Sequence, residues 1–167
     1  MTLRTLCGTG FTAFLLLGCA SAHRQDVIDD EAVDHWAGSL QPTQQRSGAL
    51  VVTSQDRAFG TVSMREVRAG NLARMHVAIT VSVPPDVGSQ LRWAVLPDRC
   101  GSGDLPLIGF EQFPLIDVGT NGRGQISADL PLELQPMGTY HLNVYSGGQQ
   151  LDNVVTCANL KFVSHSS

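Results

Sequence analysis

Two histidines stand where they could share a metal ion. His76 and His141 each lie in a segment that alternates apolar and polar residues, and each falls on the polar side of that alternation. If the two predicted strands are neighbours, the imidazoles could meet and bind Zn²⁺ or Cu²⁺ weakly. The simpler interpretation is that both side chains face solvent. The other histidines, His23, His35 and His165, lie in predicted flanking segments.

No short motif for nucleophilic catalysis is present. The chain lacks G-x-S-x-G, and the glycine-rich stretch 119–124 lacks the Lys-Ser/Thr of a phosphate-binding loop. We interpret 119–124 as a turn. The stretch 100–104 opens the longest predicted loop, and we expect partner or ligand contacts there because loops on a rigid scaffold often carry function. The sequence therefore predicts no catalytic residue and no cofactor, and it favours a protein that is not an enzyme.

Cys19 stands in a different chemical setting. Residues 1–17 carry one charge, Arg4, followed by the apolar run 11–17, which is shorter than the about 20 residues that span a bilayer. The sequence Leu16-Leu17-Gly18-Cys19 resembles the lipobox of bacterial lipoproteins. This resemblance implies cleavage before Cys19, a diacylglycerol on its thiol and a fatty acyl chain such as palmitate on its new amine. The alternative is an ordinary signal peptide with an incidental cysteine.

The resemblance to lipoproteins implies a location in the bacterial cell envelope. Ala20 follows the cysteine where Asp would favour retention in the inner membrane, so we expect an outer-membrane anchor with the domain facing the periplasm or the cell surface. Removing residues 1–18 takes away one arginine and leaves 10 basic against 15 acidic residues, a formal charge of −5. That sign argues against nucleic acid as a partner. The expected partners are the membrane, through the lipid, and an envelope protein.

The remaining chain divides at about residue 46. Residues 19–46 contain an acidic run and a polar stretch with few apolar anchors, which predicts a flexible tether behind the signal peptide 1–18. Trp36 could belong to one helical turn of that tether or could begin the domain. Residues 47–164 are predicted to form a single domain.

Period-two alternation dominates this domain. Met75, Val77, Ile79 and Val81 alternate with small or polar residues, the pattern of a half-buried strand. Turn residues separate many such segments, which predicts an all-β fold: an antiparallel Greek-key sandwich or flattened barrel of seven to eight strands. Further predicted strands cover 49–53, 60–64, 91–95, 125–128, 140–144 and 154–156.

Cys100 and Cys157 are predicted to pair. In an exported protein, two thiols in a small β-domain meet an oxidising compartment. Closing a loop of roughly 58 residues would stabilise the fold by about 4 kcal/mol in the chain-entropy model. The alternative is a metal or redox pair, although the chain has no C-x-x-C and neither cysteine has a histidine at ligand spacing.

Segments of residues 93–160 resemble, in order and spacing, the bacterial copper/zinc superoxide dismutase-like domains and the related chordin-type domains. The segments are Trp93 to Gly101, Phe113-Pro114-Leu115, Gly122 to Gln125, Tyr140 to Gly147 and Val154 to Leu160. The resemblance implies a β-sandwich and places both cysteines at the family's disulfide positions.

This sequence departs from the family at the positions of the metal ligands. The two positions of the family's H-x-H motif hold Ala94 and Leu96, and the position of a later histidine holds Tyr145. A copper site needs converging imidazoles, so the dismutase activity is not expected here. Two hypotheses follow. The first is a membrane-anchored, non-catalytic binding domain; the alternative is a degenerate domain that still binds copper or zinc through His76 and His141.

Overall fold

The computed structural model describes residues 33–43, 58–69, 72–102, 105–146 and 153–165. Within these ranges the chain is all-β, with two single-turn 3-10 segments at Pro85–Val87 and Phe110–Gln112. The predicted all-β antiparallel fold is confirmed. Its strands are β1 His35–Pro42, β2 Phe59–Ala69, β3 Leu72–Ser82, β4 Gln90–Pro97, β5 Ile116–Asp117, β6 Arg123–Leu130, β7 Tyr140–Ser146 and β8 Val154–Val163.

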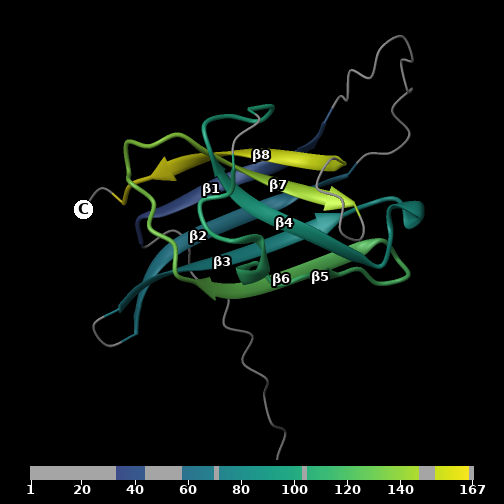
Figure 1. The fold of residues 1–167 in the computed structure, drawn as a ribbon, viewed down its shortest axis with the longest axis horizontal. Coiled ribbons are helices and arrows are strands. Elements are labelled where there is room, and N and C mark those ends of the chain that lie inside the picture. Colours follow the sequence, from purple (N-terminus) through teal and green to yellow (C-terminus); the bar gives the residue numbers. More distant parts are fainter. Residues whose placement is uncertain (1–32, 44–57, 70–71, 103–104, 147–152, 166–167) are drawn as a thin grey trace, which may run out of the picture.

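The strands form one antiparallel sheet that curls almost into a closed barrel (Figure 1). Their order across the sheet is β5-β4-β7-β8-β1-β2-β3-β6. The two ends approach each other where Val118, next to β5, bridges to Gly124 of β6. The connections from β3 to β4 and from β6 to β7 each pass over two other strands, which is the Greek-key arrangement.

Alternation along β3 fixes which side of the sheet faces the core. Met75, Val77, Ile79 and Val81 are buried, and the residues between them are half-buried or exposed. Because side chains alternate between the two faces with a period of two, this pattern also sets the register against β2 and β6. The strand predicted from the alternation of Met75 to Val81 is therefore confirmed, as are those at 91–95 and 140–144, which lie in β4 and β7.

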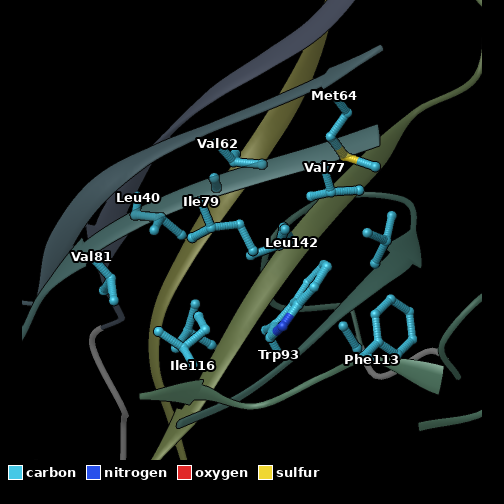
Figure 2. Packing of buried hydrophobic residues seen from close by; sticks show 14 of the residues in the cluster. Leu40, Val62, Met64, Val77, Ile79, Val81, Trp93, Phe113, Ile116 and Leu142 are labelled. Atoms are coloured by element: carbon cyan, nitrogen blue, oxygen red, sulfur yellow. The ribbon is translucent and has the colours of Figure 1, made fainter. Parts of the chain in front are cut away.

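Apolar side chains from both halves of the curled sheet fill its interior. Figure 2 shows Val62, Val77 and Ile79 on one side of this core, with Trp93 and Ile116 on the other. The Trp93 side chain is fully buried. Its indole N–H donates a 2.6 Å hydrogen bond to the carbonyl oxygen of Pro114, so the one polar atom of this ring is satisfied.

The domain begins earlier than predicted, which corrects the tether assigned to 19–46. Residues 35–42 form β1, paired with β2 on one side and β8 on the other. Trp36 and Leu40 of this strand are buried, and the Trp36 ring lies 5.3 Å from that of Phe162. The inward position between them is Gly38, which leaves a gap in the apolar alternation. The predicted strand 49–53 lies outside the described residues.

Gly38 is required by close packing in the core. A Cβ atom there would lie 2.9 Å from the carbonyl oxygen of Asn159 and 3.1 Å from the Cβ of Ala158, so β1 and β8 can pair at this point only without a side chain. Gly122 has a positive φ of 73° in the turn before β6, where its N–H donates to Gly119. The predicted turn at 119–124 is confirmed.

Among the described residues, the structure has no helix of the length and apolar character needed to cross a membrane.

Candidate functional site

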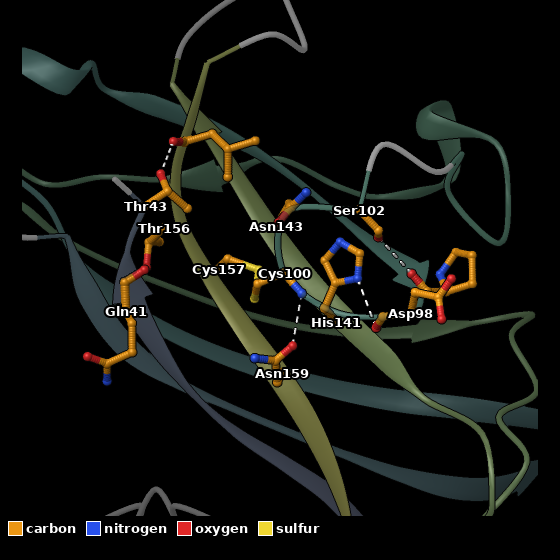
Figure 3. The surroundings of a disulfide bond; sticks show 12 residues. Gln41, Thr43, Asp98, Cys100, Ser102, His141, Asn143, Thr156, Cys157 and Asn159 are labelled. Atoms are coloured by element: carbon orange, nitrogen blue, oxygen red, sulfur yellow. Dashed lines mark hydrogen bonds between the residues drawn. A yellow bond between two sulfur atoms is a disulfide. The ribbon is translucent and has the colours of Figure 1, made fainter. Parts of the chain in front are cut away.

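Cys100 and Cys157 form the predicted disulfide, with their Cα atoms 6.0 Å apart. The bond attaches the loop after β4 to the outer face of β8 (Figure 3). A second contact supports it, because the Cys100 backbone N–H donates to the side-chain oxygen of Asn159 at 2.9 Å. The start of the loop is thus held firmly against the sheet. Gly103 and Asp104, which belong to the predicted contact loop 100–104, lie outside the described residues.

This loop buries polar side chains of β7. His141, Asn143 and Tyr145 alternate with the core residues of β7 and so point to the outer face, yet all three are buried. The His141 Nδ1 atom lies 3.1 Å from the carbonyl oxygen of Asp98, and the Tyr145 ring packs 5.6 Å from that of Phe110. The prediction that His141 faces solvent is therefore wrong, because residues after β4 cover the outer face of β7.

Two polar atoms of these buried β7 side chains have no hydrogen-bond partner among the described residues. They are Nε2 of His141 and Oδ1 of Asn143. Their neighbours on β4 are apolar, since Leu96 pairs with His141 and Ala94 pairs with Asn143. In the resemblance to the superoxide dismutase-like family, Ala94 and Leu96 are the residues aligned with two of the family's histidines, and Tyr145 is aligned with a third. The residues present therefore do not fit the copper site that the resemblance implies.

His76 lies too far along the sheet to share a metal with His141. It belongs to β3, and three strands, β8, β1 and β2, separate β3 from β7. Its imidazole is hydrogen-bonded on both sides, to Asp129 Oδ1 at 2.6 Å through Nδ1 and to Ser127 Oγ at 2.9 Å through Nε2. The alternative that His76 and His141 share a metal ion required their strands to be neighbours, and they are not. Within the described ranges no three His, Cys, Asp or Glu side chains gather as metal ligands would.

The other described histidines also take up structural positions. His35, predicted to lie in the tether, begins β1, and its Nδ1 lies 2.8 Å from the carbonyl oxygen of Val33. His165 follows β8, and its backbone N–H donates to Asp34 at 2.6 Å. Cys19 and His23 lie outside the described residues, so the lipid-attachment site remains a prediction from sequence.

A hollow of about 1010 Å³ lies on the outer face of β8, β1, β2 and β3. Small side chains line the floor of this hollow, so the surface is depressed here relative to the longer side chains around it. Cys100 and Gly101 border it. Among the described residues, those of its lining that can carry charge are His35 and Lys161, and no carboxylate lines it. This surface could not be predicted from the sequence, because its residues come from four strands whose relative register is set by pairing between distant segments. The small floor residues are Ala37, Ser39, Thr61, Ser63, Ala78 and Thr80.

The buried hydroxyl of Tyr145 is expected to make the stability of the fold depend on pH. Burial raises the pKa of the Tyr145 hydroxyl above its usual value of 10.0, and the hydrogen bond from Asn143 acts in the opposite direction. The folded protein thus holds this proton to higher pH than the unfolded chain, so stability falls as pH rises above 10. We expect the melting temperature to decline from about pH 10 upward. We expect a shallower decline for Tyr145→Phe.

Thermal denaturation between pH 7 and 11 measures this effect. Below pH 9 the two proteins should give parallel curves, because the hydroxyl is protonated in both states there. Identical slopes for the two proteins above pH 10 would contradict the assignment to Tyr145.

Searches against models of known protein families, curated proteins and solved structures find no match to this chain. Its function must therefore be argued from its own residues and geometry.

Proposed function

We propose that the chain is a lipid-anchored protein of the bacterial envelope whose β-barrel domain binds an acidic polypeptide segment of an envelope partner. The observation that carries the binding proposal is the hollow on β8, β1, β2 and β3. The Leu16-Leu17-Gly18-Cys19 lipobox supports the anchor. The antiparallel barrel and its disulfide are compatible with an exported domain.

Charge favours an acidic ligand. The mature chain predicted from the lipobox has a formal charge of −5, yet the ionisable side chains of the hollow are His35 and Lys161. Arg65 stands on the same face, because it pairs with His35 in the ladder between β1 and β2. A local excess of basic groups on an acidic protein selects ligands of negative charge and speeds their association.

Shape and polarity favour an extended polypeptide. Hydroxyl groups of Ser39, Thr61 and Thr80 lie along the hollow, and those of Thr61 and Thr80 are 2.9 Å apart. Such groups both donate and accept hydrogen bonds, as a peptide backbone requires. Because the small residues continue across three neighbouring strands, β1, β2 and β3, a chain segment can cross this part of the sheet without meeting a bulky side chain.

Binding of a fluorescein-labelled ten-residue oligoglutamate peptide tests this proposal. The mature lipoprotein in detergent should raise the anisotropy of the peptide in a saturable manner. Lys161→Glu should weaken binding at least about tenfold, which corresponds to roughly 1.4 kcal/mol. Added salt should weaken it as well.

Arg68→Glu is the matched control, since it makes the same charge change on an exposed side chain outside the hollow. It should leave the affinity within about twofold, because a distant exposed charge is screened. Equal weakening by both substitutions, or no saturable binding by the unsubstituted protein, would overturn the acidic-ligand proposal.

A further inference from the structure

We propose that Ser127, His76 and Asp129 form a nucleophilic triad that hydrolyses carboxylic esters. The Nδ1 atom of His76 lies 2.6 Å from Asp129 Oδ1, and its Nε2 atom lies 2.9 Å from Ser127 Oγ. This is the order of contacts that serine nucleophiles need: a base at the hydroxyl, and a carboxylate at the other ring nitrogen to orient the base. The proposal rests on this geometry and does not depend on the acidic ligand.

The sheet holds the three side chains together. Ser127 and Asp129 are two residues apart on β6, so they share one face of that strand. His76 pairs with Asp129 across the ladder between β3 and β6, and Ala78 pairs with Ser127. Buried Met75 and Val77 flank His76 and fix the orientation of β3. Rigid strands therefore position this site, which favours the precision that catalysis requires.

Substrate can reach the hydroxyl. Ser127 is exposed, and the side chains of His76 and Asp129 are 21% and 54% exposed. Ala78, the ladder partner of Ser127, lines the hollow described above. The serine thus stands at the β6 side of a surface that can hold a ligand. The exposed position of Ser127 favours esters of short acyl groups over long-chain lipids, because a long acyl chain needs an apolar pocket to bury it.

Arg65 supplies positive charge beside the triad. It pairs with His76 in the ladder between β2 and β3, where directly opposed Cβ atoms lie about 5 Å apart. Its Nε atom is buried and has no hydrogen-bond partner among the described residues. We assign Arg65 to the stabilisation of the oxyanion that forms on the ester carbonyl. A second arginine, Arg74, donates to the carbonyl oxygen of Asp129 at 3.1 Å and so steadies β6.

The reaction balances with water as the only co-reactant. Ser127 Oγ attacks the carbonyl carbon while its proton passes to His76 Nε2, and Asp129 stabilises the resulting imidazolium. The tetrahedral intermediate collapses, the C–O bond to the alcohol breaks, and His76 returns the proton to the leaving alkoxide. Water then attacks the acyl-serine with His76 as base, which releases the carboxylic acid and restores Ser127.

Labelling with a fluorophosphonate tests the triad directly. The probe should form a phosphonyl ester at Ser127 with loss of fluoride, and peptide mass spectrometry locates the modified residue. His76→Gln should slow labelling by about 100-fold, the contribution of a positioned base. Asp129→Asn should give a smaller loss, and Ser127→Ala should abolish labelling. Hydrolysis of p-nitrophenyl acetate should follow the same order.

Ser164→Ala is the matched control, because Ser164 is another exposed serine and lies outside both the triad and the hollow. It should label at the unsubstituted rate. A purely structural polar network predicts a different result: altered melting temperatures in the three triad variants, without labelling of the unsubstituted protein at Ser127. That result would overturn the proposal. So would undiminished labelling of Ser127 in His76→Gln, or labelling of Ser164 equal to that of Ser127.

Discussion

Replacing Cys19 with alanine is expected to abolish all incorporation of fatty acid into the protein. In cells fed an alkyne-tagged fatty acid, the unsubstituted protein should carry the tag on its N-terminal peptide and enter the detergent phase of a Triton X-114 separation. The physical reason is that each buried methylene contributes about 0.8 kcal/mol to membrane binding, so two or more chains hold a protein stably. Without the thiol, no lipid can be attached.

The mass of the product separates this outcome from ordinary secretion. Cys19→Ala should retain residues 1–18, because the lipoprotein resemblance implies cleavage only in front of the cysteine. Cys7→Ala is the matched control, since it removes the other cysteine of the N-terminal segment and should leave both the tag and cleavage unchanged. Tagged Cys19→Ala protein, or cleavage of the unsubstituted chain elsewhere, would show that the lipobox is incidental.

Removing the disulfide is expected to have the largest effect on stability. Substituting Ala for both Cys100 and Cys157 opens a covalent link between residues 57 positions apart. In the chain-entropy model this costs about 4 kcal/mol, which lowers the melting temperature by roughly 15 °C for a domain of this size. Urea denaturation of the oxidised protein and the double variant measures the difference.

The loss of local contacts is expected to lower the stability of the double variant further. The bond holds the loop after β4 beside the buried side chains of His141 and Asn143 (Figure 3), so we expect its removal to expose their polar atoms to water. Ser102→Ala is a suitable control in the same loop, because it removes only a 3.3 Å hydrogen bond to the carbonyl oxygen of Pro97, a contact of about 1 kcal/mol or less. A double variant no less stable than Ser102→Ala would contradict the role given to the disulfide.

Strands that alternate regularly were predictable from the sequence, and one that does not was missed. In β3 and β7 apolar residues occupy every second position, and this spacing alone places the strands correctly. In β1 the inward position between Trp36 and Leu40 is Gly38, and polar residues follow, so the segment looks like part of a tether. Pairing with β2 and β8 stabilises β1, and local sequence does not show such pairing.

Features of the candidate site were harder to predict because they depend on contacts between distant segments. His141 lies on the polar side of the β7 alternation, and only the loop after β4 makes that side buried. The triad joins His76 to residues more than fifty positions later, through the register between β3 and β6. Composition and spacing identify His76 as a possible reactive group, but they do not identify its partners. The disulfide was predictable because the expectation of export makes pairing the usual outcome for two thiols in a small β-domain.

The position of β1 in the sheet has a mechanical consequence for an anchored protein. In the proposed lipoprotein, tension between a bound partner and the membrane enters the domain at the start of β1. That strand lies between β2 and β8, with hydrogen-bonded ladders on both sides. A force along the axis of β1 must therefore break the hydrogen bonds of two ladders at once, whereas an edge strand is held by only one ladder. If the chain is anchored as proposed, both ladders of β1 would share the load where that strand begins.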